Sequence, residues 1–121
     1  MRKYCGLVID RLIPFETDLI KRDGFYSDKN LYCKWKAINR DQDTKIFFNL
    51  TINNIQDEKY YIEIYYFNGS KSHYQIESKT FYITSTSINY INFHFYSPEK
   101  LSYSPFIADF AIFCRLYRLT V

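Results

Sequence analysis

The stretch KYYIEIYYFNGSKSHYQIE, residues 59–77, carries the clearest signal of fold in the sequence. Its first half alternates in hydropathy with a period of two, which is typical of a strand with one buried face. The inward set is Tyr60, Ile62, Ile64 and Tyr66, and the outward set is Tyr61, Glu63, Tyr65 and Phe67. Asn68-Gly69 then gives a strong turn signal, so the stretch predicts a β-hairpin.

The length of the hairpin loop decides which side chains of the second strand face inward. A two-residue loop at Asn68-Gly69 would turn polar residues towards the core and leave apolar ones in water. A three-residue loop, Phe67-Asn68-Gly69, reverses the second strand and uses Gly69 in the left-handed conformation that such loops need. We predict the odd loop, with these residues on one face: Ile62, Ile64, Tyr74 and Ile76.

Similar runs recur along the chain, and together they indicate the fold class. The expected strands lie at residues 3–10, 31–38, 45–52, 60–67, 73–83, 89–96 and 106–117. Because no helical pattern separates them, we predict a single antiparallel β-sandwich domain of about seven strands over residues 1–121, with a partly open barrel as the alternative. One short helical turn is expected at residues 15–21, after Pro14 and before Gly24.

Tyrosine and phenylalanine are so frequent that their number alone says little about function. Aromatic residues make up 21% of the chain, and 58 of its 121 residues belong to six types with AT-rich codons: Phe, Tyr, Met, Ile, Asn and Lys. An AT-rich genome would raise these counts without selection on function. The composition suits a phage, viral or mobile-element protein, and functional arguments must rest on where the tyrosines lie.

The cysteines and the N-terminus predict a cytoplasmic protein. Cys5, Cys33 and Cys114 are odd in number and form no Cys-x-x-Cys motif, which favours free thiols in a reducing compartment. Cys33 and Cys114 fall on inward faces and are expected to be buried. The first ten residues lack the apolar segment of a signal peptide, and no apolar run approaches the roughly 20 residues that span a bilayer.

The outward face of the hairpin is the first candidate binding site. Its residues are Tyr61, Glu63, Tyr65, Phe67, Lys71 and His73. Tyrosine is favoured at interfaces, and the aromatic members would form an apolar patch that a monomer rarely leaves bare. The alternatives are that cross-strand aromatic pairs merely stabilise the sheet, or that another part of the chain covers this face.

A second stripe and a basic stretch are further candidates. The stripe is Tyr90, Asn92, His94 and Tyr96, which could stack on sugar rings or bases, or form a solvated sheet face. The basic stretch is Lys34, Lys36, Arg40 and Lys45 beside Tyr32. It could touch phosphates, but Asp41 and Asp43 partly neutralise it, and these two acidic residues are typical of a turn rather than a cation loop.

The sequence therefore favours a non-enzymatic binding module. It contains no phosphate loop, nucleophile elbow or metal-ligand spacing, so no catalytic residue, metal or cofactor is assigned. The leading hypothesis is protein–protein contact, with a second copy of the chain as the simplest partner. Binding of nucleic acid or carbohydrate through exposed tyrosines is the alternative, although the net charge of +3 is small for nucleic acid. An enzyme with a site scattered over the fold comes third.

Overall fold

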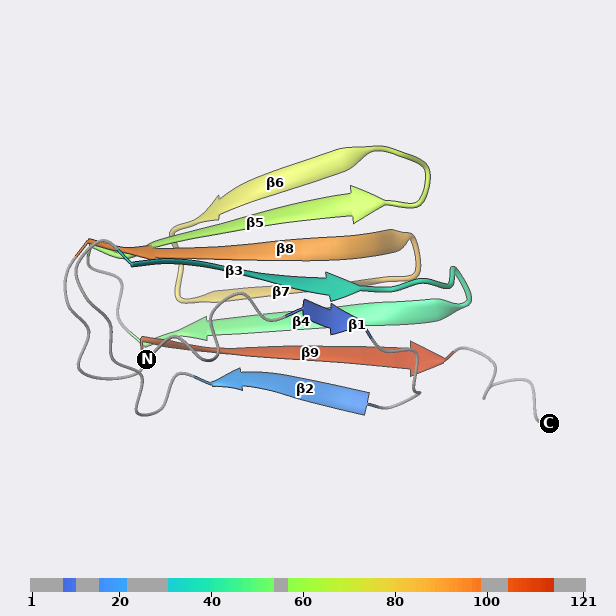
Figure 1. Cartoon of the computed structure of the whole chain (residues 1–121), viewed down its shortest axis with the longest axis horizontal. Coiled ribbons are helices and arrows are strands. Elements are labelled where there is room, and N and C mark those ends of the chain that lie inside the picture. The colour runs from blue at the N-terminus through green and yellow to red at the C-terminus, as the bar shows by residue number, and fades with distance from the viewer. Residues whose placement is uncertain (1–7, 11–15, 22–30, 54–56, 99–104, 115–121) are drawn as a thin grey trace.

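Two β-sheets make up most of the described structure (Figure 1). The computed structural model describes residues 8–10, 16–21, 31–53, 57–98 and 105–114, and side chains within 32–53, 57–98 and 105–111. Over these residues it has no helix and nine strands. They are β1 (Val8–Asp10), β2 (Glu16–Lys21), β3 (Leu31–Ile38), β4 (Thr44–Ile52), β5 (Lys59–Tyr66), β6 (Lys71–Ile76), β7 (Thr80–Ser85), β8 (Ile88–Ser97) and β9 (Phe106–Cys114).

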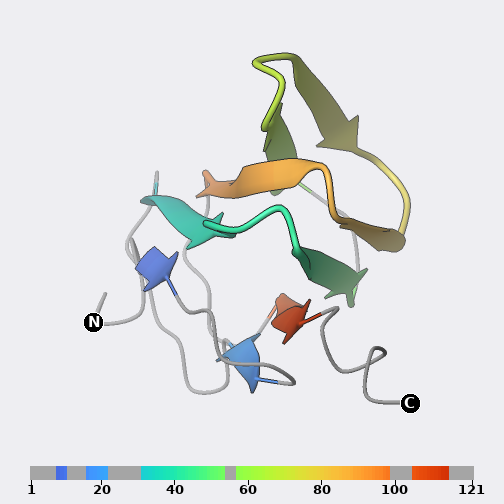
Figure 2. The same ribbon diagram turned by 90° about the vertical axis from the view of Figure 1, so that its right-hand side faces the viewer.

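The two sheets pack face to face as a sandwich (Figure 2). One has the order β1-β3-β8-β5-β6 and the other β2-β9-β4-β7. Strands β2 to β9 follow the order of a jelly roll, in which two Greek keys alternate between the sheets. All pairs are antiparallel except β1–β3, which adds a parallel edge strand. Both sheets have open edges, so the predicted sandwich is confirmed over the alternative barrel.

The inward side chains of the alternating runs fill the space between the sheets. The largest fully buried aromatic residues are Trp35, Tyr60, Phe48, Phe93, Phe95, Phe106 and Phe110. Their rings join the two layers: Phe93 of β8 meets Phe106 of β9 edge to face, with ring centroids 5.2 Å apart. Phe48 of β4 lies 5.6 Å from Phe93. The period of two in the sequence therefore identified the core correctly, because alternate side chains of a strand share one face.

The β5–β6 hairpin has the predicted three-residue loop. Tyr66 and Ser70 close it, and Gly69 N–H donates to the carbonyl of Tyr66 at 3.0 Å. Gly69 has a φ of 92°, the left-handed conformation expected there. Ile62 pairs with Tyr74, which confirms the shared face. Tyr74 is still 41% exposed, because β6 is an edge strand at the open side of the sandwich.

Two elements differ from the sequence-based prediction. The helical turn expected at 15–21 is wrong over residues 16–21, which form β2 and pair with β9 along their whole length. Sheet pairing with a distant strand outweighs a weak local helix signal. The run expected at 73–83 is divided into β6 and β7, and a turn is held by a hydrogen bond from the Ser78 hydroxyl to the Thr80 carbonyl at 2.9 Å. These changes raise the number of strands from the expected seven or so to nine among the residues that the structure describes.

Cys33 contradicts the expectation of three free thiols. Its side chain is 1% exposed, as predicted, but it forms a disulfide. Cys5 and the side chain of Cys114 lie outside the described part of the structure. An odd cysteine count without a Cys-x-x-Cys motif carries no information about which sulfur atoms meet in space, so the sequence argument failed.

Across the described residues, no helix is long and apolar enough to cross a membrane.

Candidate functional site

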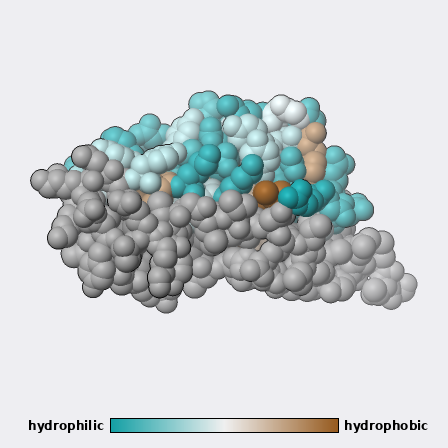
Figure 3. All heavy atoms as spheres, in the orientation of Figure 1, coloured by the Kyte–Doolittle hydropathy of each residue, from teal (hydrophilic) through white to brown (hydrophobic). Residues whose placement is uncertain are grey.

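The outer face of the five-stranded sheet brings both candidate stripes together. In the β5–β8 register, Tyr61 is opposite His94 and Tyr65 is opposite Tyr90. The β3–β8 register adds Lys34 beside His94. We call this surface the tyrosine–lysine face; it consists of Tyr32, Lys34, Lys36, Lys59, Tyr61, Glu63, Tyr65, Lys71, His73, Tyr90, Asn92, His94 and Tyr96. Figure 3 shows this side of the molecule, with hydrophilic and intermediate residues over most of the described surface.

One row of this face is a stacked ladder that crosses four strands. Tyr65 of β5 and Tyr90 of β8 stack with centroids 4.3 Å apart and ring planes 14° apart. Lys36 Nζ of β3 lies 4.3 Å from the centre of the Tyr90 ring, and Lys71 Nζ of β6 lies 5.4 Å from that of Tyr65. Ring stacking of this kind contributes about 0.5–1.5 kcal/mol, and an exposed cation–π contact about 0.5–1 kcal/mol. The flat faces of both tyrosine rings are therefore already covered by the other ring or by a lysine ammonium group.

A second row alternates tyrosine with histidine across the same four strands. The ring centroids of Tyr32 and His94 are 5.8 Å apart, those of His94 and Tyr61 are 5.5 Å apart, and those of Tyr61 and His73 are 5.7 Å apart. The rings are tilted to one another rather than stacked. Tyr32 is 55% exposed, so this row presents more open aromatic surface than the stacked ladder.

Glu63 lies between the two rows and is held by hydrogen bonds. Its Oε1 accepts from the Nδ2 of Asn92 at 3.2 Å and contacts the Nε2 of His94 at 2.8 Å. The Nδ1 of His94 is in turn hydrogen-bonded to the hydroxyl of Tyr32. Burial raises the pKa of Glu63, but the bonds from His94 and Asn92 and the charges of His94 and Lys71 outweigh it and hold the pKa below its usual value. Glu63 is thus ionised at neutral pH.

The groups on this face that are open to a partner are cationic or can donate hydrogen bonds. Of the thirteen residues that define the face, four are lysines and one is a carboxylate, Glu63, whose Oε1 already has two partners. Within the described residues, no hydrogen bond uses the hydroxyl groups of Tyr61, Tyr65 and Tyr90. Burial, followed by the negative charge of Glu63, raises the pKa of Tyr32, so this residue keeps its phenolic proton.

The remaining sequence candidates lie away from this face. Phe67 lies in the β5–β6 loop, so it does not join Tyr61 and Tyr65 in the expected apolar patch. Arg40 follows β3, and Lys45 belongs to β4 in the other sheet, so the basic stretch is divided. The side chain of Asp41 accepts from the backbone N–H of Asp43 at 2.9 Å, as expected of a turn. The described residues contain no group of acidic, histidine or cysteine side chains placed to hold a metal.

Asn39 is a structural residue that the sequence analysis missed. It is fully buried, and its Nδ2 donates to the carbonyls of Thr44 at 3.2 Å and Ile88 at 3.1 Å. Asn89 donates back to the Asn39 carbonyl at 3.0 Å. These bonds join the β3–β4 turn to the start of β8, beside the irregular pairing of Tyr65 and Tyr66 with β8. An asparagine in a turn-rich stretch gives no sign of such a distant partner.

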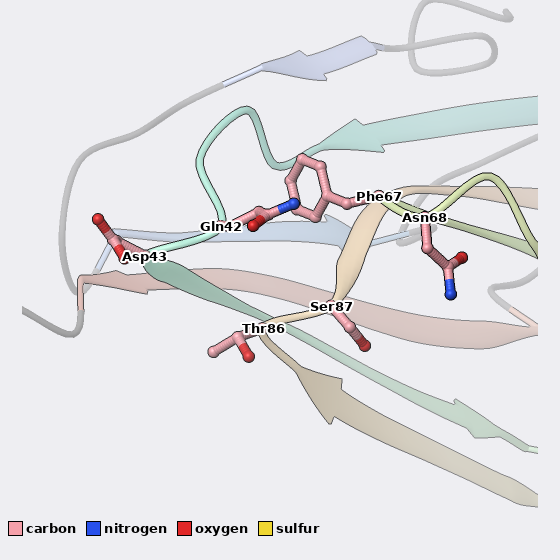
Figure 4. A pocket seen from close by; sticks show the side chains of 6 residues that line it. All are labelled: Gln42, Asp43, Phe67, Asn68, Thr86 and Ser87. Carbon is pink, nitrogen blue, oxygen red and sulfur yellow. The ribbon is translucent and has the colours of Figure 1, made fainter.

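A shallow hollow of about 330 Å³ lies where three loops meet at one end of the sandwich. It is lined by Gln42, Asp43, Phe67, Asn68, Thr86 and Ser87 (Figure 4). Asn68 Oδ1 already accepts from the backbone and hydroxyl of Ser70, and the Ser87 hydroxyl bonds to that of Ser85. In Figure 4 the Thr86 and Ser87 side chains point away from Gln42, so the polar groups do not converge.

Comparison with known proteins identifies the fold and no family. No protein-family model and no curated sequence matches the chain. The structure is similar to the MASP-1 CUB2 domain bound to Ca²⁺, with a TM-score of 0.51 and 13% identity over 88% of this chain and 97% of that one. It is also similar to the CUB1-EGF-CUB2 domains of rat MASP-1, with a TM-score of 0.51 and 8% identity over 87% of this chain and 41% of that one.

A weaker similarity is to VP2 of the infectious bursal disease virus subviral particle, with a TM-score of 0.43 and 12% identity over 84% of this chain. The chain spans only about a third of that protein, 33% of its length. At their low identities, the two MASP-1 comparisons show a shared β-sandwich fold alone.

Proposed function

We propose that this protein is a non-enzymatic binding module that contacts a protein partner through the tyrosine–lysine face. One observation carries the proposal: two stripes and part of a basic stretch, distant in sequence, form one continuous surface across β3, β8, β5 and β6. Tyrosine offers a large contact area at a low cost in conformational entropy, which favours it at protein interfaces. The composition remains in keeping with a phage, viral or mobile-element origin.

The size of the face suits a modest interface. Four strands spaced about 4.8 Å apart and about seven residues long at 3.4 Å per residue give roughly 19 by 24 Å, or about 450 Å². A stable complex buries about 800 Å² on each partner. The face alone is therefore the size of a weak or transient contact, and a tighter complex requires neighbouring surface as well.

A second copy of this chain is a poorer partner than a different protein. A two-fold pair brings the same surface of both copies together. Lys34, Lys36, Lys59 and Lys71 of each copy would then approach those of the other, with only Glu63 to compensate. Like charges placed opposite one another disfavour such an interface.

Nucleic acid is the second candidate, because the lysines flank the tyrosines. Single-stranded nucleic acids and sugars bind aromatic residues mainly by stacking on their flat faces. In the stacked ladder those faces are covered by a neighbouring tyrosine or a lysine ammonium group. The tilted row, with the exposed Tyr32, is the part of the surface that best suits this alternative.

Two tyrosines of similar exposure on opposite sheets provide the test. Tyr32 of β3 is 55% exposed on the proposed face, and Tyr82 of β7 is 59% exposed on the other sheet. We expect Tyr32→Ser to weaken binding of a partner captured from the source cells by about tenfold or more, as an interface tyrosine does. Tyr82→Ser should leave the affinity unchanged. If both variants bind the partner as tightly as the wild type, the tyrosine–lysine face is not the binding site. Light scattering on the same samples reports whether the protein self-associates.

A further inference from the structure

We infer that the partner presents an acidic, extended polypeptide segment to the tyrosine–lysine face. This inference rests on the proposed function and adds the chemistry of the partner. The segment would run along β3, where its carboxylates meet the lysine ammonium groups, and its carbonyl oxygens would accept hydrogen bonds from the neighbouring tyrosine hydroxyls.

The charge of the face is the first argument. Lys34, Lys59 and Lys71 are exposed, and Lys36 is half-buried against the Tyr90 ring. Glu63 opposes these four positive charges with one negative charge, and its Oε1 is occupied by His94 and Asn92. An arriving partner therefore meets a net positive surface, which favours an acidic one by electrostatic complementarity.

The direction in which the rings present their polar groups is the second argument. In the stacked ladder, the ring faces of Tyr65 and Tyr90 are closed by each other and by Lys71 and Lys36. Their hydroxyl groups take part in no hydrogen bond among the described residues. A hydroxyl at a ring edge suits a carbonyl or carboxylate acceptor, whereas a nucleobase needs an open ring face.

The spacing of the lysines is the third argument. Lys34 and Lys36 are two residues apart on β3, so their side chains emerge on one face about 7 Å apart. Alternate side chains of an extended peptide repeat at the same distance. A segment with acidic residues at every second position can therefore meet both lysines in register.

Charge reversal at two matched pairs of lysines tests the inference. The probe is a fluorescein-labelled peptide of alternating Glu and Thr, compared with alternating Gln and Thr and with oligo-dT, by fluorescence anisotropy. We expect the acidic peptide to bind, with an affinity that falls as salt rises, and Lys34→Glu/Lys36→Glu to weaken it by about tenfold or more. Lys45→Glu/Lys79→Glu changes the net charge equally at exposed sites outside the face and should weaken binding far less.

Three other outcomes of this experiment would contradict the inference. If the two double variants lose the same amount of affinity for the acidic peptide, the binding depends only on the net charge of the protein and not on the face. Tighter binding of oligo-dT than of the acidic peptide assigns the face to nucleic acid, and no binding of the acidic peptide removes its support. If circular dichroism shows unfolding of the charge-reversed protein, Lys34→Ala/Lys36→Ala replaces it with the same expectation.

The inference and the proposed function can fail separately. A captured partner that needs Tyr32 but binds Lys34→Glu/Lys36→Glu as tightly as the wild type supports the proposed face and refutes an acidic segment. A partner that is indifferent to Tyr32→Ser and to both lysine changes refutes both.

Discussion

At the scale of single residues, Glu63 links the binding face to the stability of the sheet. Its carboxylate accepts from Asn92 of β8 and contacts His94 of the same strand. Burial works against the ionised form, but these hydrogen bonds and the nearby positive charges outweigh it, so the pKa of Glu63 in the folded protein lies below its usual value. Folding therefore favours the charged carboxylate.

The pH dependence of stability should change in Glu63→Gln. A carboxyl whose pKa is lowered by folding stabilises the protein above its unfolded pKa, about 4.3, and that stability is lost as the pH falls through the lower folded value. We expect urea midpoints of the wild type to fall more steeply below about pH 5 than those of Glu63→Gln. Glu77→Gln, at an exposed site, should follow the wild type. If the urea midpoints of the wild type and Glu63→Gln change in parallel with pH, the ionised Glu63 carboxylate does not stabilise the folded protein.

The sequence placed most of these residues on the correct face but could not reveal their contacts. Alternation alone assigned Glu63 and Tyr65 to the outward side of their strand. The register that puts Asn92 opposite Glu63, and Tyr90 opposite Tyr65, depends on which strands become neighbours. Phe67 was assigned to the same side, but the strand ends at Tyr66 and the alternation ends with it.

At the scale of elements, the β5–β6 hairpin shows how a burial pattern overrides a turn preference. Asn68-Gly69 alone favours a two-residue loop, yet that register would have exposed Ile76, which is 7% exposed in the structure. β2 illustrates the opposite case. Its partner β9 lies about 90 residues further along the chain, and no local pattern of Glu16–Lys21 reports that pairing.

Gly69→Ala should destabilise the hairpin through its backbone alone. Gly69 has a positive φ of 92°, and an added Cβ would meet no atom within 4 Å. The cost is therefore conformational, about 1–2 kcal/mol, and should appear as a lower unfolding midpoint in urea. Gly69→Asn should lose less, because asparagine tolerates this conformation better than alanine. If alanine is as stable as glycine, the three-residue loop does not have the backbone described.

At the scale of the whole molecule, strand order creates the candidate site. Jelly-roll order inserts β8 between β3 and β5, so residues 90–96 lie between residues 32–36 and 59–65. The sequence indicated three separate candidates: the outward face of the hairpin, the second stripe and the basic stretch. Sheet pairing brings two lysines of the basic stretch beside the second stripe, because Lys34 and Lys36 pair with His94 and Asn92. Pairings across about 30 and 60 residues decide this arrangement, and they have no local signature in the chain.

The disulfide of Cys33 is also a property of the whole fold, and it yields a testable stability difference. Of three cysteines, one bond leaves one free thiol, so the unreduced, denatured protein should be alkylated once and the reduced protein three times, as measured by mass spectrometry. Because Cys33 is 1% exposed, we expect mild reductant to cleave the bond slowly in the native protein and quickly in urea. Reduction should lower the free energy of unfolding by about 2–4 kcal/mol, because the bond restricts the unfolded chain. Cys33→Ser should show a similar loss of unfolding free energy and no further response to reductant.

Disulfides persist in oxidising surroundings, so this bond removes the cysteine-based argument for a reducing compartment. Three alkylated thiols in the unreduced protein would restore that argument and contradict the disulfide.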